Sequence, residues 1–383
     1  MKDFNIFYFD NEMGGGFDEF NPRFVMEQNF VKEVIKILAQ NEPLSYSVGD
    51  LEKTLGSKYI QSAVDLLKNV LAIREENGKL ALNFSFFADK DCKIIKKIVE
   101  KNLKNNNSFL KAKVNEFGQF LKKLYPDIDE KILLYHLLCG KVFDGSIFDY
   151  LEERNLLKQS YPKRECRDFM IIGYENSTYC NKLNADLFCS FNHARYAQNS
   201  LSSFGNASGE RFDYFRYFKL REKGGLYGKF LAVDKLLHDY SNQEIVSRSF
   251  EILQQIKESL PYSKNKFYCV LKMFGYIDGN DQIAVPVFDE YIEKCAKFSK
   301  FVFENVGDFI AGSITEIRDL VIKSKISCVK HGVDVDELCN ELWHIYFGLL
   351  NKYLIDEKIV ASPQQFYNQG KYLKCIYFSN SFK

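Results

Sequence analysis

Apolar residues recur at helical spacing in three short stretches between about Met26 and Leu67. In each stretch they fall on one stripe of an α-helix, and polar residues occupy the rest of the surface. The spacing therefore predicts three short amphipathic helices. The three stripes are Val31, Val34, Ile35 and Leu38; then Val48, Leu51 and Leu55; then Ile60, Val64 and Leu67.

Polar residues and turn formers mark the ends of these helices. Pro43 follows the first helix and prevents it from continuing. Ser47 and Asp50 have the spacing of a capping box, in which each side chain satisfies a free backbone amide at the start of the second helix. We expect Gly56 to end that helix and Ser57 to cap the third.

The pair Asn77-Gly78 predicts a β-hairpin directly after the third helix. Both residues tolerate the positive φ angles of a type I′ turn, the preferred two-residue connection between antiparallel strands. This turn fixes the register of the strands. The predicted pairs are Glu76 with Lys79, Ile73 with Leu82 and Leu71 with Phe84.

Three helices followed by a hairpin in about sixty residues resemble the winged-helix branch of the helix-turn-helix proteins. The resemblance covers residues 26–87, about a sixth of the chain. It implies that the third helix docks in the major groove of DNA while neighbouring residues contact phosphates. The implied contact residues are Ser57, Lys58, Tyr59, Gln61, Ser62 and Lys68 on the helix, with Arg74 and Lys79 on the wing.

The rest of the chain mixes strand and helix patterns. We expect strands at residues 4–9 and 168–174, and a hairpin that pairs residues 267–277 with 282–288. Two helices are expected between residues 128 and 157, and further helices at 230–237, 243–260, 288–306, 309–323 and 334–355. The predicted fold class is therefore α+β and mostly helical, with an N-terminal winged helix and a larger helix-rich α+β region that contains at least one hairpin.

These patterns suggest four consecutive parts. Residues 1–25 form a strand and a glycine-rich lead, residues 26–90 the winged-helix domain, residues 91–160 a lysine-rich helical connector, and residues 161–383 an α+β sensor or oligomerisation domain. The connector is expected to break at Asn105-Asn106-Asn107. Pro162 and the charged cluster 163–165 mark its boundary with the last part.

Charge is unevenly distributed between the winged-helix domain and the connector. Residues 91–125 contain nine lysines and three acidic residues, a net charge of +6, whereas residues 26–90 contain eight basic and nine acidic residues, a net charge of −1. DNA-binding modules gain most of their non-specific affinity from positive charge. The lysine-rich stretch would have to supply that charge, unless its lysines form only a solvated helix face.

Composition narrows the class of protein. No run of apolar residues is long enough for a membrane span. The start of the chain lacks the charged and then apolar pattern of a signal peptide. Ten cysteines occur without a Cys-x-x-Cys pair, which favours reduced thiols. We therefore expect a cytoplasmic protein that has no membrane partner.

Residues 192–229 form the densest polar stretch. From it we predict a ligand-binding set of His193, Arg195, Arg211 and Tyr214. Neither a P-loop nor a Rossmann glycine pattern is present. A surface loop with no ligand is the alternative interpretation of the same stretch.

Two further patterns combine histidine with other metal-ligand types. Cys328-x-x-His331 with Cys339 lacks a second pair of similar spacing, which a zinc site would need. Glu341-x-x-His344 lacks the second Glu-x-x-His of a di-iron bundle. We predict no metal site, no cofactor and no assigned catalytic residue.

The preferred hypothesis is a DNA-binding transcription regulator whose C-terminal region senses a ligand or forms a homodimer. The strongly apolar helix 334–355 is expected to pack either in the core of its own domain or against a second copy of the chain. One alternative is a winged-helix module that binds a protein or peptide instead of DNA. A second alternative is an enzyme with a site around His193, Arg195 and Ser203. An enzyme is the less favoured of these classes.

Overall fold

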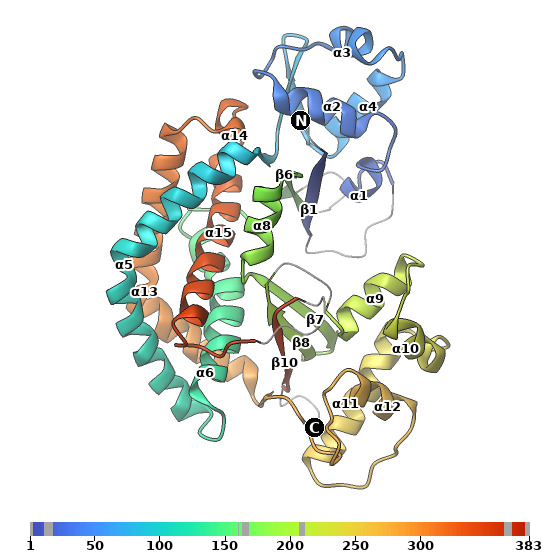
Figure 1. The fold of residues 1–383 in the computed structure, drawn as a ribbon, viewed down its shortest axis with the longest axis vertical. Helices are drawn as coiled ribbons and strands as arrows, with labels where there is room; N and C mark the ends of the chain where they lie inside the picture. Colours follow the sequence, from blue (N-terminus) through green and yellow to red (C-terminus); the bar gives the residue numbers. More distant parts are fainter. Residues whose placement is uncertain are drawn as a thin grey trace. The chain divides into compact units, whose positions relative to one another are not determined.

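The computed structural model describes residues 3–10, 18–159, 161–162, 168–206, 211–363 and 370–379. The fold is mixed α+β, and helices predominate (Figure 1), as expected from the sequence. Residue contacts divide it into two units, each assembled from three segments. Unit 1 comprises residues 1–107, 147–184 and 306–346, and unit 2 comprises residues 108–146, 185–305 and 347–383. Among the described residues, no helix is both long and apolar enough to cross a membrane.

Unit 1 begins with β1 (Phe4–Asp10) and the helices α1 (Pro22–Val25), α2 (Val31–Gln40), α3 (Val48–Leu55) and α4 (Ile60–Asn69). Figure 1 shows α2, α3 and α4 packed together. Most of the predicted stripe residues are buried in one core, because each helix turns its apolar side to the other two. The three predicted helices are confirmed.

The helix ends follow the predicted signals with one exception. Ser47 and Asp50 form the capping box, and Gly56 ends α3 in the left-handed region at φ 65°. Ser57 does not cap α4. Its Oγ accepts a hydrogen bond from the amide of Tyr59, so the chain makes a turn there before α4 begins at Ile60.

The predicted hairpin consists of β2 (Ile73–Glu76) and β3 (Lys79–Leu82). Asn77 and Gly78 adopt the expected positive φ angles of 49° and 75°. The pairs of Ile73 with Leu82 and Glu76 with Lys79 are confirmed.

Two details of this hairpin differ from the prediction. The pair of Leu71 with Phe84 does not form, because Leu71 takes a left-handed conformation at φ 54° and ends the ladder. Tyr46, between α2 and α3, forms an additional antiparallel bridge with Leu80.

A second sheet of unit 1 has β6 (Asp168–Glu175) at its centre, which confirms the predicted strand 168–174. β1 pairs with it in antiparallel and β4 (Ser85–Phe87) in parallel orientation, and β5 (Tyr161–Pro162) pairs with its first residues. Beside this sheet, Cys92 and Cys180 are fully buried and their Sγ atoms lie 3.1 Å apart. The nine described cysteines are all free.

The long helices are more continuous than predicted. α5 (Asp89–Leu124) runs through the three asparagines without a break. The Asn106 side chain donates to the backbone oxygen of Asn102, so this amide bonds within the helix and does not interrupt it. α13 (Tyr291–Lys323) likewise joins the two helices predicted at 288–306 and 309–323, and α15 (Val335–Asp356) matches its prediction. The short α14 (Ser327–Lys330) precedes α15.

The region predicted to hold two helices between residues 128 and 157 contains two helical segments that meet at a kink. α6 (Glu130–Leu133) continues as the π-helical segment η1 (Leu134–Ser146), in which Asp144 has the non-helical angles φ −102° and ψ 26°, and α7 (Ile147–Glu152) follows. Single π-helical turns are rare and occur often at functional sites. The charged cluster 163–165, predicted as a boundary, lies outside the described residues.

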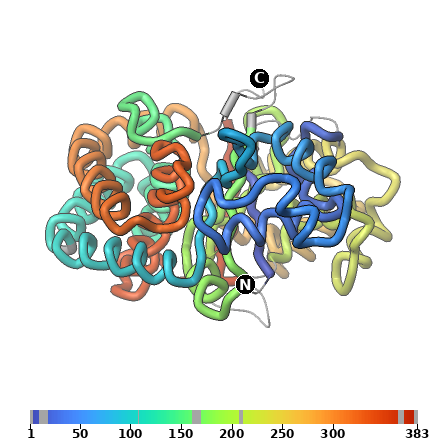
Figure 2. The backbone as a smooth tube through the Cα atoms, turned by 90° about the horizontal axis from the view of Figure 1, so that it is seen from above, coloured from blue at the N-terminus to red at the C-terminus, as the bar shows by residue number. Residues whose placement is uncertain are grey.

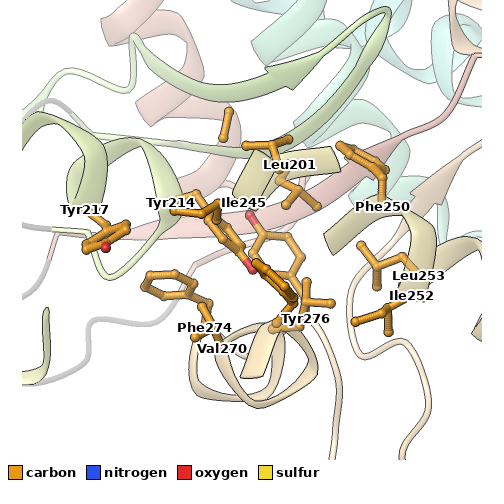
Figure 3. Close-up of a cluster of buried hydrophobic side chains, with 14 of the residues drawn as sticks. Leu201, Tyr214, Tyr217, Ile245, Phe250, Ile252, Leu253, Val270, Phe274 and Tyr276 are labelled. Atoms are coloured by element: carbon orange, nitrogen blue, oxygen red, sulfur yellow. The ribbon is translucent and has the colours of Figure 1, made fainter. Parts of the chain in front are cut away.

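Unit 2 contains a four-stranded sheet in the order β7 (Ser190–Tyr196), β8 (Asn199–Gly205), β10 (Tyr372–Tyr377) and β9 (Val287–Phe288). Four helices lie beside it as one group (Figures 1 and 2): α9 (Tyr214–Glu222), α10 (Lys229–Leu237), α11 (Asn242–Lys257) and α12 (Lys266–Met273). Their buried side chains pack against Leu201 of β8 (Figure 3), and Ile376 of β10 belongs to the same core. The remaining helix, α8 (Thr178–Asp186), begins in unit 1.

The hairpin predicted at 267–277 with 282–288 is wrong. Residues 266–273 form α12, which Asn265 caps, and only one bridge, between Ile277 and Ile283, joins the two segments. Phe267, Val270, Leu271 and Phe274 are buried at helical spacing. Their aromatic and β-branched character favoured a strand, but packing against the other helices of unit 2 decided for the helix.

Candidate functional site

The α4 face, predicted to bind DNA, consists of Lys58 and Tyr59 in the turn before α4 and of Gln61 and Ser62 in the first turn of the helix. All four residues are exposed, and Tyr59 is 64% exposed. The opposite side of the helix is fully buried. Lys58 places its Nζ 5.7 Å from the ring centre of Tyr59 and has no acidic partner among the described residues. The α4 face is therefore open to a partner.

The other three predicted basic contacts are ion-paired. Lys68 pairs with Glu75, Arg74 with Glu76, and Lys79 with Asp50. Hydrogen bonds from Lys79 and Ser47 hold the pKa of the Asp50 carboxyl well below its usual range. Arg74 also donates from Nη2 to the backbone oxygen of His331, at 2.7 Å. These bonds reduce the positive charge that the wing presents to a polyanion.

The lysine-rich helix α5 is also partly neutralised. Lys93 pairs with Asp89 and Lys96 with Glu100, both at helical spacing of four residues. Within unit 1, Lys97, Lys101 and Lys104 have no ion pair among the described residues. This part of α5 keeps some of the positive charge that the sequence indicated.

The four predicted ligand-binding residues do not form one group. His193 and Arg195 alternate along β7 and so project from the same side of the sheet. His193 lies opposite Ser202 in the ladder, and its Nδ1 is 2.8 Å from the Ser202 Oγ and 3.1 Å from the Ser200 Oγ. Both hydroxyls are buried and lie 2.6 Å apart.

The Arg211 side chain links the ends of β7 and β8 by hydrogen bonds. Its Nη1 donates to the backbone oxygen and the Oγ of Ser203, at 2.9 and 3.1 Å, and its Nη2 donates to the backbone oxygens of Ser190 and Asn206. The side chain is 3% exposed. Ser203 in turn donates to Asp213, which caps α9. This arrangement positions the chain between the strands and α9, and it turns Ser203 away from His193.

Tyr214 belongs to the hydrophobic core of unit 2. Its ring packs on those of Phe274 and Tyr276, with centroids 4.6 and 5.9 Å away (Figure 3). Its hydroxyl hydrogen-bonds to Ser249, and the side chain is 1% exposed. Its position is that of a core residue.

Lys141, on the π-helix η1, joins the His193 side of the sheet and was not singled out from the sequence. Its Nζ lies 4.9, 5.3 and 4.4 Å from the ring centres of Phe191, Tyr291 and Tyr377. No carboxylate among the described residues pairs with it. Burial lowers the pKa of Lys141 to about 8. We call the group Lys141, Phe191, His193, Arg195, Tyr291 and Tyr377 the Lys141 site.

Lys141 has no direct signal in the sequence. It lies in an apolar stretch 52 residues before His193, and its place depends on how the π-helix packs against the sheet. The one sequence feature that could have pointed to Lys141 is that its neighbours on the helix are apolar.

The residues of the two histidine patterns considered as metal sites make other contacts in the structure. The His331 Nδ1 accepts a hydrogen bond from the amide of Leu82 at 3.2 Å, and burial lowers the pKa of His331 to about 4. Glu341 accepts a hydrogen bond from Tyr174, and burial raises the pKa of Glu341 to about 7. Among the described residues, no group of three or more potential ligands is arranged to hold a metal ion.

Comparisons with protein-family models, with curated proteins and with solved structures gave no match for this chain. Functional assignment therefore depends on the geometry of the chain itself.

Proposed function

We propose that this chain is a DNA-binding transcription regulator that uses α4 as its recognition helix. The observation that carries the proposal is the two-sided character of α4, whose apolar side is completely buried while its polar side is exposed. The order of helix α2, bridge at Tyr46, helices α3 and α4, and the hairpin β2–β3 supports it, because winged helices use this arrangement to present one helix to the major groove.

The exposed residues suggest which side chains would contact bases and which would contact phosphates. Gln61 and Ser62 carry the amide and hydroxyl groups that read base edges, and Lys58 carries the unpaired charge. Lys68, Arg74 and Lys79 would have to exchange a carboxylate for a phosphate. We therefore expect weak non-specific binding, so that affinity depends on the correct base sequence.

The ion pairs on the wing favour one other function. If the α4 face binds a protein or peptide, neutralised charge around it is an advantage, since like-charge repulsion with the partner is avoided. Such binding would depend little on salt concentration. DNA binding would weaken steeply with salt, because each neutralised phosphate releases counterions.

The test measures binding of the full chain to fluorescent random-sequence duplex DNA by anisotropy, at several salt concentrations. Lys58→Glu with Lys68→Glu places two negative charges on and beside the α4 face. We expect at least a tenfold loss of affinity and a smaller salt slope, because two phosphate contacts are replaced by repulsion.

The matched control is Lys32→Glu with Lys323→Glu, which changes net charge equally at exposed unit 1 lysines outside the α4 face. It should bind nearly as well as the parent chain. Equal loss in both double variants, or no salt-dependent binding by the parent chain, would contradict the proposal.

A further inference from the structure

We propose that the Lys141 site binds a small molecule through an oxyanion, a phosphate or a carboxylate group. The inference deepens the proposed function, since it names the class of ligand that the C-terminal region would sense. All of its residues belong to unit 2. It is argued from contacts of that unit alone.

The positive charge of Lys141 has no counter-ion among the described residues. Lys141 is half-buried, and an ammonium group that is partly removed from water without a counter-ion costs free energy. Three aromatic rings surround Lys141 and partly stabilise the cation, but they do not neutralise it. With a pKa of about 8, the side chain still carries its charge at neutral pH. An anionic ligand would supply the missing partner.

The neighbouring titratable groups do not cancel this charge. Asp144, on the same π-helix, forms no ion pair, and burial raises its pKa well above the usual range, which favours the neutral acid. Burial raises the pKa of the Cys295 and Cys375 thiols to about 11 and about 12, so both are neutral at pH 7. The site therefore carries net positive charge.

Arg195 adds a second cation at the edge of the site. It is exposed and has no acidic partner among the described residues. Its charge lowers the pKa of Lys141, of His193 and of Tyr291, which places the guanidinium near all three. Two unpaired cations that face one region are the usual way to hold a phosphate or carboxylate, and arginine binds both in a fork geometry.

His193 supplies a neutral donor. Burial and the charges of Lys141 and Arg195 lower its pKa well below the usual value, so the imidazole is uncharged. When Nδ1 accepts a hydrogen bond from the Ser200 or Ser202 hydroxyl, the proton of the ring is on Nε2. Nε2 has no partner among the described residues, and its N–H is available to an anion.

The aromatic residues indicate what the anion is attached to. Phe191 and Tyr291 are only partly buried, and the Phe191 ring lies 4.2 Å from the His193 ring, centre to centre. Beside the cations they provide an apolar surface for a flat organic body. We therefore expect benzoate to bind more tightly than acetate, and inorganic phosphate to report on the cations alone.

The experiment is isothermal titration calorimetry of the full chain, without DNA, with phosphate, benzoate or acetate at constant ionic strength. Arg195→Gln should weaken phosphate and benzoate binding about tenfold, because one charged hydrogen bond is lost from an exposed position that does not support the fold. Lys141→Met should abolish binding of both. Its circular dichroism spectrum and thermal melting establish whether the variant is folded.

Arg248→Gln is the matched control, since Arg248 is an exposed arginine on α11, outside the site. It should bind like the parent chain. The inference is overturned if the parent chain binds none of the three anions, or if Arg248→Gln loses as much affinity as Arg195→Gln. Because no DNA is present, failure here leaves the DNA-binding test unaffected, and the reverse also holds.

Discussion

At the scale of single residues, His136 shows how burial changes a polar side chain. It lies on the π-helix between the rings of Tyr135 and Phe288, and neither of its ring nitrogens has a hydrogen-bond partner within the part of the chain that the structure describes. Burial lowers the pKa of His136 to about 3. The folded chain therefore holds this histidine neutral, whereas the unfolded chain protonates it below about pH 6.5.

Replacing His136→Phe should stabilise the protein, and increasingly so in acid. At pH 8 the gain is about 1 kcal/mol, because two unsatisfied buried nitrogens are removed. Between pH 6.5 and about 3 the folded parent chain resists a proton that the unfolded chain accepts, so its stability falls as the pH falls. At pH 5 the advantage of the variant should be about 2 kcal/mol larger than at pH 8.

Urea denaturation at both pH values measures this difference, and comparison with the parent chain cancels the titration of all other groups. His238→Gln is the control, because the His238 side chain is 60% exposed. It should follow the parent chain at both pH values. A stability difference for His136→Phe that does not change between pH 8 and pH 5 would refute this account.

Single residues also show what the sequence could and could not predict about the candidate site. His193 and Arg195 stood out because they lie in a polar stretch. Ser202, and not Ser203, shares the side of the sheet with His193, because neighbouring residues of a strand face opposite sides, and β8 was not predicted as a strand. Arg211 and Tyr214 have residue types that are common in binding sites. In the structure Arg211 hydrogen-bonds to the strand ends, and Tyr214 lies in the hydrophobic core.

At the scale of elements, local signals decide how well a helix is predicted. The ends of α3 depend on residues within one turn, and Ser47, Asp50 and Gly56 act as their types suggest. α12 depends on packing with helices distant in the sequence. Such packing is not visible in the local sequence, and the aromatic residues of α12 indicated a strand. The π-helical form of η1 could not be predicted either, because the spacing of apolar residues does not distinguish a π-helix from an α-helix.

The capping box of α3 should be measurable in the stability of the chain. Ser47→Ala removes the side chain that accepts from the Asp50 amide and donates to its carboxylate. We expect a loss of about 1 kcal/mol in the free energy of unfolding, typical of an N-cap serine. Urea denaturation followed by circular dichroism gives the value.

Ser45→Ala is the matched control for this substitution. Ser45 lies two residues earlier, is exposed, and donates only to the backbone oxygen of Glu42. Its loss should cost a few tenths of a kcal/mol, as for most surface positions. Equal destabilisation by both variants would show that the capping box has no special role.

At the scale of the whole molecule, contacts join segments that are far apart in the sequence. The chain enters each unit three times. Helical periodicity and turn residues report only on neighbours along the chain, so this organisation could not be predicted from the patterns that located the helices.

The Cys92–Cys180 pair offers a direct test of one such contact. The sulfur atoms lie 3.1 Å apart and need to approach to about 2.05 Å to form a disulfide. Mild oxidation with diamide should link them and stabilise the folded chain by up to about 4 kcal/mol, because the crosslink closes a long loop of the unfolded chain. A rise in the melting temperature, reversed by a thiol reductant, is the expected measurement.

Cys180→Ser separates this crosslink from the other thiols. It should show no rise in melting temperature with diamide, and peptide mapping of the oxidised parent chain should recover the Cys92–Cys180 link. Recovery of other crosslinks alone would mean that the two helix segments are not adjacent.

The central position of β6 determines when the sheet of β1, β4 and β6 can form during protein synthesis. β1 and β4 are made early, yet the strand that joins them ends at Glu175. At about 5–20 residues per second, the ribosome needs on the order of 10–30 s after β1 to deliver it. During that interval the apolar first strand has an unpaired edge, and a nascent-chain chaperone is the natural protection against wrong pairing.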